Sequence, residues 1–169
     1  IMKRYITIFF TLFALTVVAQ SKFGYVSCKD IVESLPEYSV VTKDLNELLQ
    51  KYEAEIDRAD LEFNKKYVEF IEDQGSFPQT ILQKRHRELQ DLMEKSIQFK
   101  EEVKLAMQDA EKEMMAPLRK KVDGAIKQLC EDKGYSYILD LDKNTCLYIN
   151  PKYGVDVTNA LKEALGIKH

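Results

Sequence analysis

The sequence has no tryptophan and only six glycines, four prolines and two histidines among its 169 residues. Because glycine and proline are scarce, few positions force a helix to end, and long helices are expected. His86 stands among basic residues and His169 is the last residue, so neither is placed beside a nucleophile or a set of metal ligands. No glycine-rich phosphate loop is present. We therefore expect no enzyme, no metal site and no cofactor.

Cysteine is scarce as well. Cys28, Cys130 and Cys146 form no Cys-x-x-Cys pair, which excludes a thioredoxin-like redox motif. Two of them can form a disulfide if the chain is exported, and Cys28 with Cys146 is the pair to test. The alternative is that all three are free thiols.

The first residues have the three parts of a secretory signal peptide. Lys3 and Arg4 precede an uncharged run from Tyr5 to Ser21, and Val17-Val18-Ala19 offers modest side chains at the positions that a signal peptidase reads. The uncharged run is shorter than the roughly 20 apolar residues of a spanning helix. We therefore predict cleavage after Ala19, with a membrane anchor as the alternative.

Cationic charge is in the minority. The chain has 25 Lys and Arg residues against 28 Asp and Glu residues, and cleavage after Ala19 removes two basic residues and no acidic one, leaving 23 against 28 and a net charge of −5. Nucleic-acid binding needs clustered cations facing phosphate, so it is not expected. Acidic charge also disfavours general adhesion to anionic lipid, and membrane contact stays an open question.

The middle of the chain predicts two long helices. The first runs from about Pro36 to Gln74 and the second from about Gln79 to Lys133, with a tip near residues 75–78. Apolar residues of the first helix recur every 11 residues, a period that keeps an apolar stripe nearly straight along the helix. We predict that this stripe is the seam of a helical hairpin, formed by Val41, Leu45, Leu48, Tyr52, Ile56, Phe63, Tyr67 and Phe70.

Two further residues shape the second helix. Pro117 removes a helical hydrogen bond, so we predict a kink and a hinge at this residue. Gly134 stands at the position where helices usually end.

Both ends of the chain predict short strands. We expect a strand at about Phe23–Val26, a capped helix from Cys28 to Ser34, and a β-hairpin made by residues 135–141 and 146–149. Asp156 caps a last helix at about residues 157–165. The candidate core of the body, or of an oligomer, consists of Phe23, Tyr25, Val26, Tyr137, Ile138, Leu139, Leu147 and Ile149.

These elements predict an α+β fold that is predominantly helical. The domain covers residues 20–169, with a small β body made by residues 20–36 and 118–169 and a long helical arm at residues 37–117. Three short strands are too few for an independently stable sheet, and a two-helix arm buries only one stripe on each helix. Oligomerisation would supply the missing core.

Two segments resemble the Skp/OmpH family of periplasmic chaperones: FGYVSCKDIVESLPEY (Phe23–Tyr38) and APLRKKVDGAIKQLCEDKGYSYILDLD (Ala116–Asp142). The resemblance covers essentially the whole mature chain. It implies a homotrimer in the periplasm whose arms surround a cavity for unfolded outer-membrane β-barrel proteins, an ATP-independent holdase. The best-known members are strongly basic, whereas this mature chain is acidic. A structural or scaffolding coiled-coil protein of the envelope is the alternative.

The same reading gives candidates for contact with a client protein. Some are apolar residues with adaptable or outward-facing side chains, and others belong to the one basic cluster, near the tip. They are Phe77, Phe99, Met93, Met107, Met114, Lys84, Arg85 and Arg87.

The signal peptide gives a direct prediction. When the whole coding sequence is expressed in a bacterium with an active secretion system, intact-mass measurement of the exported protein should give a chain that begins at Gln20. Replacing Ala19 with a bulky Phe should slow cleavage because the peptidase selects small residues at this position. An exported wild-type chain that still carries residues 1–19 would contradict cleavage and favour the anchor.

Overall fold

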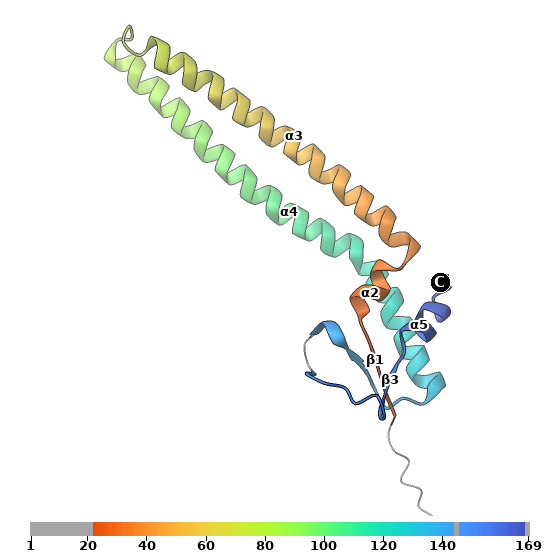
Figure 1. Ribbon diagram of the computed structural model, residues 1–169. Helices are drawn as coiled ribbons and strands as arrows, with labels where there is room; N and C mark the ends of the chain where they lie inside the picture. Colours follow the sequence, from red (N-terminus) through yellow and green to blue (C-terminus); the bar gives the residue numbers. More distant parts are fainter. Residues whose placement is uncertain (1–21, 144–145, 168–169) are drawn as a thin grey trace, which may run out of the picture.

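The computed structural model describes residues 22–143 and 146–167. Figure 1 shows a small body, in which the two ends of the described chain meet, and a long arm of two antiparallel helices that projects from it. The predicted α+β fold, mostly helical with a projecting hairpin, is confirmed. The predicted signal peptide lies outside the described residues.

The arm consists of α3 (Pro36–Asp73) and α4 (Gln79–Lys133). Pro36 occupies the first turn of α3, where a missing backbone N–H costs no helical hydrogen bond. The helix α4 ends at Gly134, whose φ of 67° lies in the left-handed region that glycine adopts readily. Both long helices therefore begin and end close to the residues that the sequence indicated.

Pro117 lies inside α4, which continues through it without a break. Figure 1 shows the part of α4 in the body running more steeply than the part in the arm. The hinge motion at Pro117 stays a prediction from the sequence.

The sheet has three strands: β1 (Phe23–Val26), β2 (Ile138–Asp140) and β3 (Gly154–Asp156). The strand β1 is central, and both neighbours run parallel to it. Gly24 pairs with Ile138 on one side and with Val155 on the other. The short helix α2 (Cys28–Glu33) follows β1, and the side chain of Ser27 accepts a hydrogen bond from the Asp30 N–H as the capping pattern predicted.

The predicted hairpin of residues 135–141 and 146–149 is wrong. After β2 the chain forms a 3₁₀ turn, η1 (Leu141–Lys143), and the third strand begins only at Gly154. A Cβ on Gly154 would lie only 2.6 Å from the Ile149 side chain and 2.9 Å from the Phe23 ring, closer than real Cβ atoms come to other heavy atoms. Glycine at this position lets β3 approach β1, whereas residues 146–149 pass outside the sheet. Leu147 is fully exposed, at 106%, and adds nothing to the core of the body.

The core of the body lies between one face of the sheet, the body end of α4 and the last helix, α5 (Thr158–Ala164). The helix begins one residue later than predicted, and the Asp156 carboxylate accepts a hydrogen bond from the Thr158 N–H at 2.9 Å. The most completely buried side chains are Val26, Ile31, Val122, Val157 and Leu161.

The opposite face of the sheet is only partly covered. Phe23 and Tyr25 are half-buried, and Phe23 stacks on Tyr137 with ring centroids 5.3 Å apart. Tyr137 itself is exposed, while Ile138, Leu139 and Ile149 are half-buried. Among the predicted core residues, Val26 is in the core and Ile138 packs against it.

The core predicts a contrast between two isoleucines. Ile31 is completely buried, so Ile31→Ala should destabilise the protein by about 2–5 kcal/mol, the usual cost of such a cavity. Ile97 on the arm is exposed, and Ile97→Ala should change stability by no more than about 0.5 kcal/mol. Urea unfolding at one fixed protein concentration measures both. Equal losses in the two variants would contradict the placement of the core.

Candidate binding surfaces of the arm and body

The predicted seam lies between the two helices of the arm. On α3, seven of its residues are half-buried: Val41, Leu45, Leu48, Tyr52, Ile56, Phe63 and Phe70. Tyr67 is exposed and stacks on Phe63, with ring centroids 6.0 Å apart. With only two helices in contact, most seam residues keep one side open to solvent, so half-burial is the usual outcome.

The inner side of α4 includes Phe99, one of the residues predicted to contact a client. Leu92, Ser96, Phe99 and Val103 follow one another at helical spacings of three and four, and they are half-buried or buried. Phe99 therefore faces α3 and is no free contact surface. Met93 follows Leu92 directly, lies outside this inner row and is exposed. Met107 and Met114 are half-buried along the same inner side.

A polar cluster interrupts the seam halfway along the arm. The Asp60 carboxylate accepts hydrogen bonds from the Lys100 ammonium at 2.9 and 3.0 Å and from the Ser96 hydroxyl at 3.0 Å. The bonds from Lys100 and then Ser96 hold the pKa of Asp60 below its usual value. Because the cluster joins the two helices at one level, it fixes their register. Sequence reasoning missed it, although a serine at an inner helical position is a usable signal.

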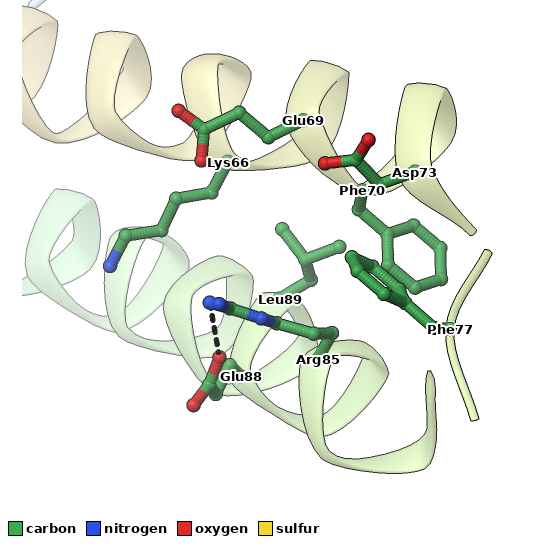
Figure 2. A pocket seen from close by; sticks show the side chains of 8 residues that line it. All are labelled: Lys66, Glu69, Phe70, Asp73, Phe77, Arg85, Glu88 and Leu89. Atoms are coloured by element: carbon green, nitrogen blue, oxygen red, sulfur yellow. Dashed lines mark hydrogen bonds and ion pairs between the residues drawn. The ribbon is translucent and has the colours of Figure 1, made fainter. Parts of the chain in front are cut away.

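At the tip, Figure 2 shows Phe77 lying against Phe70 and close to Leu89, with charged side chains around them. The cavity that these residues line holds about 100 Å³. Phe77 is half-buried here and closes the end of the hairpin. This space is too small for a polypeptide side chain of a client together with its backbone.

The basic cluster of the tip is partly neutralised. Lys84 and Arg85 both approach the Glu88 carboxylate, at 3.5 and 3.3 Å, and Figure 2 shows the second of these pairs. Arg87 is exposed. Two of the three basic candidates thus already have an anionic neighbour on their own helix.

Two carboxylates, Asp140 at the end of β2 and Asp142 in η1, bind the start of the helix α2. Asp142 accepts hydrogen bonds from the Lys29 N–H at 2.7 Å and from the Ser27 hydroxyl at 2.9 Å. The Lys29 N–H contributes most to holding the pKa of Asp142 below its usual value. Asp140 accepts from the Cys28 N–H at 3.4 Å and from the Asp142 N–H at 3.1 Å. The carboxylates therefore fix the start of α2 at the junction of arm and body.

The cysteines are free thiols in this structure. Burial, followed by the nearby Asp140, raises the pKa of Cys28 to about 12, so its thiol stays protonated and unreactive at neutral pH. Cys130 donates to the carbonyl of Tyr135 at 3.2 Å, and Cys146 is exposed. The Cys28–Cys146 disulfide is not formed.

A larger hollow lies at the junction of arm and body, with a volume of about 700 Å³. Its apolar wall includes Val32, Met115 and Ile126, and charged groups of both signs surround them. Within residues 22–143 and 146–167, no three His, Cys, Asp or Glu side chains come close enough to hold a metal ion. In the same residues no helix is long and apolar enough to cross a membrane.

Comparisons with known proteins agree with this arrangement. The family model described as "Outer membrane protein (OmpH-like)" matches residues 22–165. No curated protein matches the chain. Among solved structures, a proposed outer membrane chaperone (OmpH-like) from Caulobacter crescentus CB15 superposes with a TM-score of 0.68. The two are 17% identical, and the match covers 87% of this chain and 85% of the other. At this identity the match shows a shared fold.

The Asp142 contacts predict a pH-dependent contribution to stability. Because the pKa of Asp142 is lowered in the folded protein, its carboxylate stabilises the fold fully above the usual carboxyl pKa of 3.8. This stabilisation is lost as the pH falls through the lower folded-state pKa. Asp142→Asn should therefore unfold at a lower urea concentration than the wild type at pH 7, and the gap should close in acid. Asp109→Asn, at an exposed site on α4, is the control. A gap that stays constant from pH 7 to pH 3 would contradict this role.

Proposed function

We propose a chaperone function for this protein from one established premise: the chain belongs to the OmpH-like family of outer membrane proteins. In this proposal the protein is exported to the periplasm and binds unfolded outer-membrane β-barrel proteins. It prevents their aggregation and releases them without hydrolysing ATP. The predicted signal peptide and the absence of a phosphate loop from the sequence support export and nucleotide independence.

The observation that carries the proposal is the exposure of large apolar side chains along the arm. Leu61 is 69% exposed and Ile97 is 58% exposed, although the arm has its own seam and the body its own core. Clustered exposed apolar residues mark binding surfaces in soluble proteins. An unfolded client offers no fixed geometry, so weak and non-directional burial against such residues suits it.

We also propose that the protein assembles with copies of itself. Parallel sheets are normally covered on both faces, but here the face with Phe23, Tyr25 and Tyr137 is only partly covered. The outer edges of β2 and β3 have no strand beside them in the described chain. Further copies can cover this face and these edges together, and the number three comes from the family resemblance.

The excess of acidic over basic residues in the chain favours a second candidate function. A scaffolding protein of the envelope would hold a folded partner with its arms and would leave unfolded proteins to aggregate. The holdase test distinguishes the two.

The test uses the exported, processed protein. A urea-unfolded outer-membrane β-barrel protein is diluted into it without nucleotide, and multi-angle light scattering on a sizing column gives the mass of what stays soluble. We expect a complex of three copies of this chain and one client. Exposed apolar groups on both partners would hold it together.

An acidic helical protein of similar size, tested at the same concentration, controls for general crowding. If the client aggregates as fast as it does beside this control while the protein remains a trimer, the holdase proposal fails and the scaffold stands. A soluble complex with another stoichiometry would keep the holdase and overturn the trimer.

A further inference from the structure

The two flanks of the arm differ in character, and one of them is marked by the Asp60–Lys100 pair. On α3 the residues of this flank follow one another at spacings of three or four, which places them on one side of the helix. They are Glu53, Asp57, Leu61, Asn64, Val68 and Glu72. Asp60 lies next to this row, between Asp57 and Asn64, and points toward α4.

The helix α4 supplies a second row on the same flank. Lys100 reaches Asp60, so residues at helical spacings from Lys100 face the same way. This row consists of Met93, Ile97, Lys100, Lys104, Gln108 and Glu111. We call the two rows together the Asp60–Lys100 flank.

The flank exposes apolar side chains from both helices. Leu61 and Val68 are exposed on α3, and Met93 and Ile97 are exposed on α4. Toward the body the flank continues into a shallow groove of about 450 Å³ between the helices, which Leu49 and Met107 help to line. The apolar surface therefore extends from near the tip toward the base of the arm.

Unpaired acidic residues border this apolar surface. Within the part of the chain that the structure describes, no Lys, Arg or His comes within ion-pair distance of Glu53, Asp57, Glu72 or Glu111. The two lysines of the flank are already engaged, Lys100 by Asp60 and Lys104 by Glu101 at 3.8 Å. The flank thus combines exposed apolar groups with an excess of negative charge.

The opposite flank of α3 is neutralised by its own residues. Arg58 pairs with Glu55 at 3.0 Å, and Lys66 pairs with Glu62 at 2.9 Å. Along this stretch of α3 it offers a charged, solvated surface, and the exposed Val40 lies nearer the base of the arm. Exposed apolar side chains from both helices gather on the Asp60–Lys100 flank, which makes it the preferred side for a client that seeks apolar contact.

We propose that the Asp60–Lys100 flank binds unfolded polypeptide segments in which apolar residues are interspersed with lysine or arginine. This inference rests on the proposed chaperone function and names the side of the arm and the kind of segment that it takes. The apolar side chains of the segment cover Leu61, Val68, Met93 and Ile97. Lysine and arginine suit the acidic border because their stems lie along apolar surface while their charged ends reach a carboxylate.

The negative charge of this flank sets the preference for basic over acidic segments. Exposed charges attract the opposite sign more weakly as salt screens them, so the preference for basic segments should decline with ionic strength while apolar contact persists. The basic tip does not reverse this preference, because Lys84 and Arg85 already face Glu88.

The first experiment compares three fluorescent 16-residue peptides by anisotropy with the processed protein. One alternates leucine and valine with lysine, the second has glutamate in place of lysine, and the third has serine. At low salt we expect the lysine peptide to bind about tenfold more tightly than the glutamate peptide, with the serine peptide between them. The difference should shrink at high salt. Equal binding of the two charged peptides, or tighter binding of the glutamate peptide, would overturn the proposal.

The second experiment locates the site with two matched double variants. Leu61→Ser with Ile97→Ser removes apolar side chains from the flank, and Val40→Ser with Leu105→Ser removes side chains that are 58% and 59% exposed elsewhere on the arm. Binding of the lysine peptide should weaken about tenfold in the first variant and stay within about twofold in the second. Circular dichroism confirms that both remain folded.

The outcomes separate this inference from the proposed function. If the wild type keeps a β-barrel client soluble but both double variants bind the peptide alike, the flank is wrong and the holdase stands. If the wild type holds no client at all, the holdase itself fails.

A third double variant, Glu53→Gln with Asp57→Asn, tests the acidic border. If this variant loses binding of the lysine peptide alone, the acidic border is supported. If it loses binding of all three peptides, the acidic border is overturned.

Discussion

The whole architecture depends on the parallel pairing of β1 with β2. Parallel strands cannot be joined by a tight turn and need a crossover connection. Here the crossover consists of residues 27–137, which include α2 and the entire arm. The arm is therefore an extended crossover of a small parallel sheet. Its base is fixed where the sheet and α4 share one core, and its tip is free to project into solvent.

The two-helix arm cannot bury much, and this has shaped its sequence. Each helix has only one inner stripe, so side chains such as Leu45 and Phe63 remain half-buried. Register along such a seam is weakly specified by apolar contacts alone, because one apolar residue can replace another. The Asp60–Ser96–Lys100 cluster specifies the register, because its ion pair needs opposite charges at the same level and its hydrogen bonds need a fixed direction. The exposed apolar residues beside this cluster are then left for other molecules.

Much of this structure follows from local signals in the sequence. Pro36 and Gly134 mark helix ends through their own backbone geometry, and the 11-residue period marks the inner stripe of α3 within about three turns of one helix. The third strand could not be located in this way. Residues 146–149 include the aromatic and β-branched residues typical of strands, yet β3 forms at Gly154, where a missing side chain lets Phe23 approach. Pairing of this kind depends on residues far apart in the chain.

The candidate site was only partly predictable for a related reason. Met93 and Phe99 are both apolar and differ by less than two turns, yet Met93 faces solvent and Phe99 faces α3. Which side of α4 turns inward is decided by its partner helix.

The long crossover also sets the order in which the protein is completed. A ribosome makes β1 at the start of the described chain and β2 and β3 only near its end, at roughly 5–20 residues per second. The helices of the arm, held by local contacts, can form in the meantime. During that interval β1 has no neighbour on either side. A chain cut short between Lys133 and Ile138 would carry a finished arm and an unpaired β1, so such incomplete copies would be more prone to aggregate than complete ones.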